Sequence, residues 1–127
     1  MIIKVLSLNS NSNESLVSFE SIVGNGIAVW SGNLPAQNDS VDVELNIDDD
    51  FTWGENITTT DTDTSTITME NDELHFVAEV VALEDEDCLT IKLGGTILFL
   101  DIEGAPNDIS GWVKGLASQV SLHPSNL

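Results

Sequence analysis

Short runs in which apolar and polar residues alternate constrain the fold of this chain more than any other feature. Residues 41–47 read Val-Asp-Val-Glu-Leu-Asn-Ile, and residues 88–93 and 96–103 alternate in the same way. Successive side chains of a β-strand point to opposite faces, so this pattern predicts strands with one buried face and one solvent face. Further strands are expected at residues 2–8, 16–23, 27–31, 65–70 and 74–83.

The segment 108–120 allows two interpretations. Asp108 would cap a short helix, but Gly111 and Gly115 would each weaken that helix by about 1 kcal/mol. A strand pair is therefore favoured, with Val120 and Leu122 closing the sheet. About nine antiparallel strands with little helix predict a single acidic all-β domain over residues 1–127, either a small OB-like barrel or a β-sandwich.

The acidic residues are concentrated in the middle of the chain. There are 22 Asp and Glu residues against 3 Lys and Arg, which gives a formal net charge of −19. Seventeen of the acids lie between Asp39 and Asp87, a segment without Lys or Arg. Charge of one sign at this density opposes folding through self-repulsion. This asymmetry is the main observation that a function must explain.

The charge and the cysteine content exclude several partners and compartments. Nucleic acids and anionic membranes are bound through Lys and Arg, so we expect neither direct nucleic-acid binding nor membrane binding. The N-terminus lacks a basic segment followed by an apolar core, and no apolar stretch approaches the length of a membrane span. Cys88 is the only cysteine, so no intrachain disulfide can form. These features favour a cytoplasmic protein.

Candidate catalytic and metal-binding residues are few. His75 and His123 are interpreted as strand residues, and the chain has no Gly-rich phosphate loop, nucleophile elbow or His-rich metal motif. Asp61 and Asp63 have the spacing of calcium ligands in an EF-hand, but Thr66 stands where that loop needs glycine. We therefore expect no enzyme activity, no cofactor and no specific metal site.

The acidic middle segment supplies the candidate partner-binding residues. Residues 48–55 read Asp-Asp-Asp-Phe-Thr-Trp-Gly-Glu and place two aromatic side chains beside four carboxylates, as in a charged interface around an aromatic anchor. An alternative of equal weight is that Phe51 and Trp53 continue the core while the acids face solvent. The full candidate set is Asp48, Asp49, Asp50, Phe51, Trp53, Glu55, Asp61, Asp63, Glu84, Asp85, Glu86 and Asp87.

An acidic surface accelerates association with a basic protein through long-range steering. Many basic proteins are nucleases or nucleic-acid-binding factors, because their substrate is a polyanion. The expected partner is therefore a basic protein whose substrate groove is occupied by carboxylates in place of phosphates.

A resemblance to a known family agrees with this expectation. The run Val-Asp-Val-Glu-Leu-Asn-Ile-Asp at 41–48, followed by Trp53-Gly54, resembles bacterial immunity proteins, which protect cells from nuclease toxins in systems such as contact-dependent growth inhibition. Residues 111–114 and 120–124 are similar to the end of small bacterial OB-like barrel proteins. The resemblance extends loosely over most of the chain and includes no diagnostic motif. It implies a tight one-to-one complex with a cognate toxin.

The acidic charge is also compatible with four alternatives. A phage-type DNA mimic would use the same charge against a broad range of host proteins. Halophilic adaptation would spread acids along the whole chain, whereas the ends of this one are nearly balanced. A structural or carbohydrate-binding β-module would use the acids for calcium and melt at a calcium-dependent temperature. A glycosidase would need a carboxylate pair within an aromatic-lined cleft.

Overall fold

The computed structural model describes residues 1–11 and 14–125, and this part of the chain contains twelve strands and no helix. The all-β prediction is confirmed, but there are more strands than expected. The strands are β1 (Ile2–Asn11), β2 (Glu14–Ser21), β3 (Gly24–Trp30), β4 (Ser40–Ile47), β5 (Asp50–Thr52), β6 (Ile57–Thr59), β7 (Thr66–Glu70), β8 (Glu73–Glu84), β9 (Cys88–Leu93), β10 (Thr96–Glu103), β11 (Trp112–Ala117) and β12 (Val120–Pro124).

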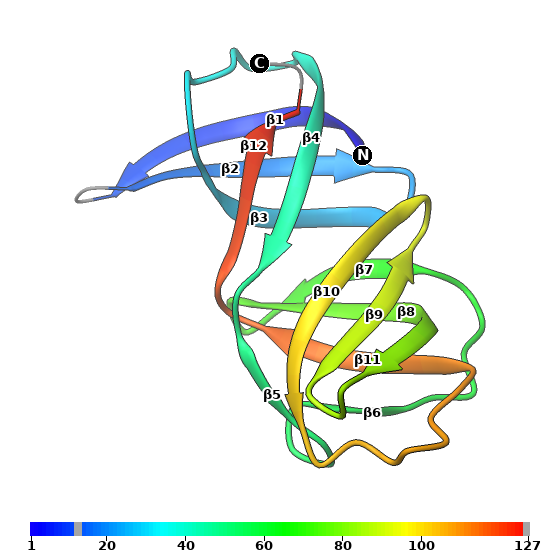
Figure 1. Ribbon diagram of the computed structural model, residues 1–127. Coiled ribbons are helices and arrows are strands. Elements are labelled where there is room, and N and C mark those ends of the chain that lie inside the picture. The colour runs from blue at the N-terminus through cyan, green and yellow to red at the C-terminus, as the bar shows by residue number, and fades with distance from the viewer. Residues whose placement is uncertain (12–13, 126–127) are drawn as a thin grey trace.

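Five strands close into a small barrel in the order β12-β4-β1-β2-β3, in the upper part of Figure 1. Closure depends on β12, which pairs antiparallel with β4 and parallel with β3. Val120 and Leu122 of β12 are both buried. The expectation of strands rather than a helix after residue 108, and of closure by Val120 and Leu122, is therefore confirmed. The two strands do not form a pair, however, because β11 pairs with β6 and β8.

Six of the other strands form a second ring below the barrel, and β7 connects this ring to β3. The sheet continues from β3 through β7, β8, β9 and β10 to β5, and β11 pairs with both β8 and β6. A bridge between Trp53 and Ile57 joins the β5 segment to β6 and closes the ring. The long strand β8 pairs with β7 and β11 along its first half and with β9 along its second half, and its ladder with β9 is irregular between Val80 and Ala82.

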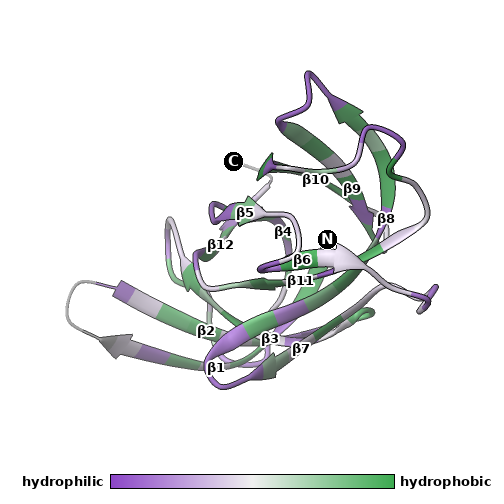
Figure 2. Cartoon of the chain, turned by 90° about the horizontal axis from the view of Figure 1, so that it is seen from below, coloured by the Kyte–Doolittle hydropathy of each residue, from purple (hydrophilic) through white to green (hydrophobic). Residues whose placement is uncertain are grey.

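One hydrophobic cluster, with buried members from all twelve strands, forms the core. Figure 2 shows the underlying alternation as green and purple bands along the strands. Phe51 and Phe76, both in this cluster, meet edge to face with ring centroids 6.0 Å apart. A Cβ atom on Gly115 would lie only 2.4 Å from the Phe76 ring, so glycine is the residue that this close packing tolerates.

The expected and observed strands differ mainly at two short elements. β5 and β6 have three residues each, which is too short for an alternating pattern to be recognised. Ile57–Thr59 therefore lies in a strand, although the Thr-rich stretch from residue 58 onward is typical of a loop. The expected all-antiparallel pairing is also incomplete, because β5 with β10, β12 with β3 and β7 with β3 pair in parallel.

Candidate partner-binding surface

The structure separates the candidate residues between 48 and 55 into buried and exposed groups. Asp48, Asp50 and Glu55 are exposed, whereas Asp49 and Phe51 are buried. The alternation within β5 and the residues before it produces this separation, because every second side chain turns inward. Phe51 packs in the core, as the alternative interpretation anticipated, and is not accessible to a partner.

The carboxylate of Asp49 has a structural role. It accepts hydrogen bonds from the backbone N–H groups of Ser118 and Gln119, both at 2.8 Å, and from the Ser118 hydroxyl at 3.1 Å. The Asp48 N–H also donates to the Gln119 carbonyl at 2.9 Å. These bonds tie the link between β4 and β5 to the turn between β11 and β12. We therefore exclude Asp49 from the partner-binding surface.

Trp53 lies between core and surface. Its side chain is half-buried and packs against the core cluster, and its backbone N–H donates to the Glu103 carbonyl at 2.9 Å. Gly54 follows with a positive φ of 87°, which turns the chain toward β6. Part of the indole thus remains available at the end of β5, beside the exposed Glu55.

Four carboxylates from three segments line one hollow of about 360 Å³, which we call the acidic hollow. Asp50 comes from β5, Asp101 and Glu103 come from β10, and Asp87 comes from the turn between β8 and β9. The Ile102 N–H donates to the Asp87 carbonyl at 3.0 Å and holds this turn against β10. All four acidic residues are exposed.

The strand register aligns three carboxylates in one row and places two of them, Asp101 and Asp50, directly beside each other. Glu84 pairs with Cys88, Cys88 with Asp101, and Asp101 with Asp50, which makes one row across β8, β9, β10 and β5. Paired positions project from the same face of a sheet, and neighbouring strands lie about 4.8 Å apart. The three carboxylates of this row therefore repel one another.

Within the described residues, no basic group compensates the acidic hollow. Among residues 1–11 and 14–125, the carboxylates with a basic partner are those of Asp42, Glu44 and Glu70, none of which lines the hollow. Their partners are the Met1 amino group and the two histidines. The lysines form no ion pair within these residues. The charge of the acidic hollow is thus available to an external cation.

The remaining candidates lie in two further segments. The turn from Glu84 to Asp87 is fully exposed, with positive φ at Asp85 and Glu86, and it contributes Asp87 to the acidic hollow. Asp61 and Asp63 are exposed in the loop between β6 and β7 and do not line the hollow. Of the candidate acids, the structure therefore brings Asp50 and Asp87 together at the hollow and leaves Asp61 and Asp63 apart from it.

Asp101 and Glu103 were not among the candidates. The alternation in residues 96–103 already places them on one solvent face of a strand. The alternating pattern does not indicate that β10 pairs in parallel with β5, a pairing that joins residues about fifty positions apart in the sequence. The signal that could have identified these two residues as candidates is their position as acids at alternate places in an otherwise apolar strand.

The same row perturbs the only thiol. Burial raises the pKa of Cys88 above its ordinary value, and the charges of Glu84, Asp101, Asp87 and Asp85 raise it further. We expect alkylation of Cys88 by iodoacetamide to be slow at neutral pH and to follow this raised pKa. Glu84→Gln combined with Asp101→Asn should shift the pH profile downward. An unchanged profile would contradict the register described here.

The raised thiol pKa also predicts how stability depends on pH. The folded protein keeps the Cys88 proton to higher pH than the unfolded chain does. The free energy of unfolding should therefore be unaffected by this group below the ordinary thiol pKa and should fall as pH rises through the raised value. Cys88→Ser should remove this alkaline decline in urea titrations.

Relief of the charge row should stabilise the protein. Asp101→Asn removes a charge flanked by Asp50 and lying in one row with Glu84. We expect it to raise the free energy of unfolding by about 0.5 kcal/mol at low ionic strength, with a smaller gain in molar salt. Urea titrations at two salt concentrations measure this difference. A loss of stability would mean that the Asp101 carboxylate makes a stabilising contact.

Comparisons with known proteins identify no relative of this chain, so the function of the surface has to be inferred from its residues. Protein-family models, curated proteins and solved structures yield no match to this chain. In the part of the chain that the structure describes, no three His, Cys, Asp or Glu side chains are grouped to hold a metal ion. Nor do the described residues include a helix long and apolar enough to cross a membrane.

Proposed function

We propose that this protein is an inhibitor that binds a basic partner protein, a cognate nuclease toxin, and blocks the groove that receives its nucleic-acid substrate. The observation that supports this proposal best is the acidic hollow. Four exposed carboxylates from β5, β10 and the turn between β8 and β9 line it, and none of them forms an ion pair with a basic group among the described residues.

The arrangement of these carboxylates suits the replacement of phosphates. Asp50 and Asp101 lie on neighbouring strands about 4.8 Å apart, and Asp101 and Glu103 are about 7 Å apart along β10. Asp50, Asp101 and Glu103 belong to paired strands, so their backbone positions are set before binding and only their side chains lose conformational freedom. A groove that binds phosphates with Lys and Arg would accept anions at these spacings.

Two stages of binding follow from the charge distribution. The net charge of −19 attracts a basic protein over distances near the Debye length and raises the association rate. Close contact at the hollow then forms charge-assisted hydrogen bonds, with Trp53 as the adjacent aromatic contact. Salt should therefore slow association strongly and affect dissociation less.

The proposal is tested first by affinity capture from a lysate of the source cell at low salt and at about 0.5 M salt. We expect one basic protein to remain bound to the wild type at high salt and to be lost by the hollow variant. The hollow variant carries Asp50→Asn, Asp87→Asn, Asp101→Asn and Glu103→Gln.

A control variant separates the hollow from net charge. It removes the same number of charges at exposed positions outside the hollow and should retain the captured protein. Its substitutions are Glu14→Gln, Glu20→Gln, Asp72→Asn and Asp108→Asn. Capture of many basic proteins that all dissociate at high salt would refute a cognate inhibitor, and a broad set retained at high salt would favour a DNA mimic.

A further inference from the structure

Two strand edges elsewhere in the fold lack a partner among the described strands. β4 pairs with β12 along Val43–Ile47 but with β1 only over Ser40–Asp42. β10 pairs with β9 from Thr96 onward but with β5 only from Asp101. Within the described part of the chain, one edge of residues 44–47 and one edge of residues 96–100 are therefore left without a β-ladder.

Both edges line the same groove, which has a volume of about 640 Å³. Its walls are two consecutive runs, residues 42–47 of β4 with the following Asp48 and residues 95–99 of the turn and β10. Alternate residues would line the face of a strand, whereas consecutive residues line its edge. The backbones of both strands therefore face the groove.

The two strands also run in the same direction along the groove. In Figure 1 the arrows of β4 and β10 both point downward, and the strands approach each other toward their lower ends. A single extended segment placed between them would be antiparallel to both, or parallel to both. Because the two strands converge, the groove does not keep a strand spacing of about 4.8 Å on both sides of such a segment. An added segment therefore pairs with one edge, and the other strand forms the opposite wall.

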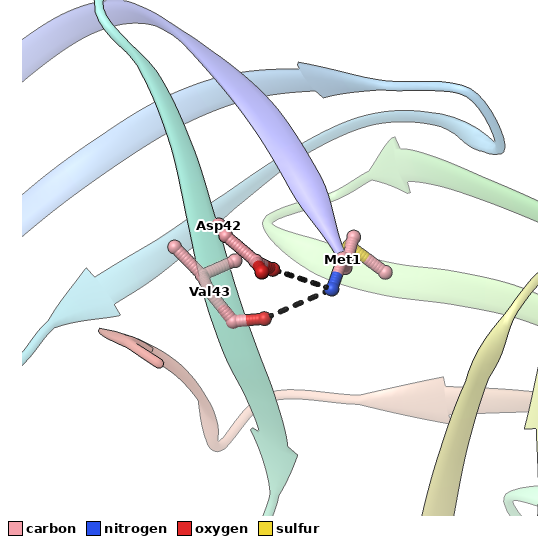
Figure 3. A network of polar contacts seen from close by, with 3 residues as sticks. All are labelled: Met1, Asp42 and Val43. Carbon is pink, nitrogen blue, oxygen red and sulfur yellow. Dashed lines mark hydrogen bonds and ion pairs between the residues drawn. The ribbon is translucent and has the colours of Figure 1, made fainter. Parts of the chain in front are cut away.

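The beginning of the chain marks one end of the groove. The Met1 amino group donates to the Asp42 carboxylate at 3.2 Å and to the Val43 carbonyl at 3.1 Å, as Figure 3 shows. The Val43 N–H in turn donates to the Met1 carbonyl at 2.8 Å. Pairing between β1 and β4 ends at this point, and the free edge of β4 begins just beyond it.

The side chains along the groove combine apolar and acidic groups. Phe99 is 67% exposed and Ile97 is 47% exposed on the β10 side, while Glu44 and Asp48 are exposed on the β4 side. Exposed strand edges are usually protected by Lys or Pro, and neither residue occurs in 44–47 or 96–100. The edges are thus open to pairing.

We propose that this groove binds an extended segment of a basic partner protein by strand addition to the free edge of β10, with β4 as the opposite wall. Residues of the segment that face inward would meet Leu45 and Leu98, which line the groove, so apolar side chains fit there. Residues that face outward would lie between Glu44 and Phe99, where Lys or Arg gains both a carboxylate and an aromatic face.

Charge complementarity favours this occupant over a second copy of the chain. Each copy carries a net charge of −19, so two copies repel one another. A basic segment with alternating apolar residues satisfies both the carboxylates and the apolar walls. This inference goes beyond the proposed function, because it requires neither a nuclease partner nor the acidic hollow.

The test uses the whole protein and a synthetic heptapeptide in which Lys and Val alternate. The matched control peptide has the same sequence with N-methyl groups on alternate residues, which removes backbone donors and keeps every side chain and charge. We expect the unmodified peptide to bind at least about 10-fold more tightly, as the loss of two ladder hydrogen bonds implies. Backbone NMR titration and amide exchange report the site.

The N–H groups of Ile97 and Phe99 face the groove, so their amide signals should shift and gain protection from exchange. The amides of Leu45 and Ile47, which face the groove from β4, should shift as well. Phe99→Ala should weaken binding of the unmodified peptide several-fold, whereas Ile22→Ala removes an exposed apolar residue elsewhere and should have no effect. Equal binding of the two peptides would overturn strand addition. Shifts confined to the acidic hollow, or dimerisation of the protein through these edges, would overturn it as well.

Discussion

Gly24→Ala should destabilise the protein by about 4 kcal/mol and lower its melting temperature by more than about 10 °C. A Cβ atom at this position would lie 2.0 Å from the Ile67 carbonyl oxygen, and φ is +134°. The obstructing atom belongs to the backbone of β7, so no rotamer change relieves the clash. Gly24 also pairs with Ile67 where β3 of the barrel meets β7.

The control for this prediction is another glycine. Gly95 lies in the turn between β9 and β10, has no positive φ, and a Cβ atom there would meet nothing within 4 Å. Gly95→Ala should therefore change the free energy of unfolding by less than about 0.5 kcal/mol. Urea unfolding followed by circular dichroism compares the two variants. Equal stability of both would show that β3 and β7 do not approach as closely as described.

Asp49→Ala should cost about 3 kcal/mol of stability, the second largest effect that we expect. The substitution removes the acceptor of three hydrogen bonds and leaves the N–H groups of Ser118 and Gln119 without their partner. Asp49 is 8% exposed, so water compensates poorly. Asp49→Asn should cost less, because the amide oxygen still accepts one or two of these bonds.

The neighbouring Asp48 provides the matched control. Its side chain is exposed and belongs to the same acidic run. Asp48→Ala should leave stability unchanged or raise it slightly, because repulsion within the run decreases. Urea titrations of both variants measure their free energies of unfolding and test this difference. If Asp48→Ala destabilised the protein as much as Asp49→Ala, general effects of the segment rather than the Asp49 hydrogen bonds would be responsible.

Most of the strands could be predicted from the sequence because their alternation extends over five or more residues. Residues 96–103 form β10 with the expected bounds, and Leu98, Leu100 and Ile102 are its buried side chains. Strands β5 and β6 could not be predicted, because three residues carry no period. The parallel pairings were also inaccessible, since they depend on chain reversals between distant segments and not on local pattern.

The sequence predicted that the candidate site would consist of carboxylates, but it identified only some of the residues that form it. An excess of unpaired carboxylates follows from composition, and the turn at 84–87 follows from its acidic run. The inward orientation of Asp49 needed the turn at Ser118, which lies 69 residues away in sequence. The acidic hollow needed the pairing of β5 with β10. Local sequence therefore indicated which residue types form the site, whereas tertiary contacts determine which of these residues are buried and which line the hollow.

The central claim is that the acidic hollow itself, and not net charge alone, binds the basic partner. Association and dissociation rates of the purified captured protein should be measured with the wild type, the hollow variant and the control variant.

We expect the control to associate somewhat more slowly than the wild type and to dissociate at the same rate. The hollow variant should dissociate at least about 100-fold faster, because its charge-assisted hydrogen bonds are lost. Equal dissociation rates for the two variants would contradict the claim, since charge removed anywhere on the surface would then have the same effect.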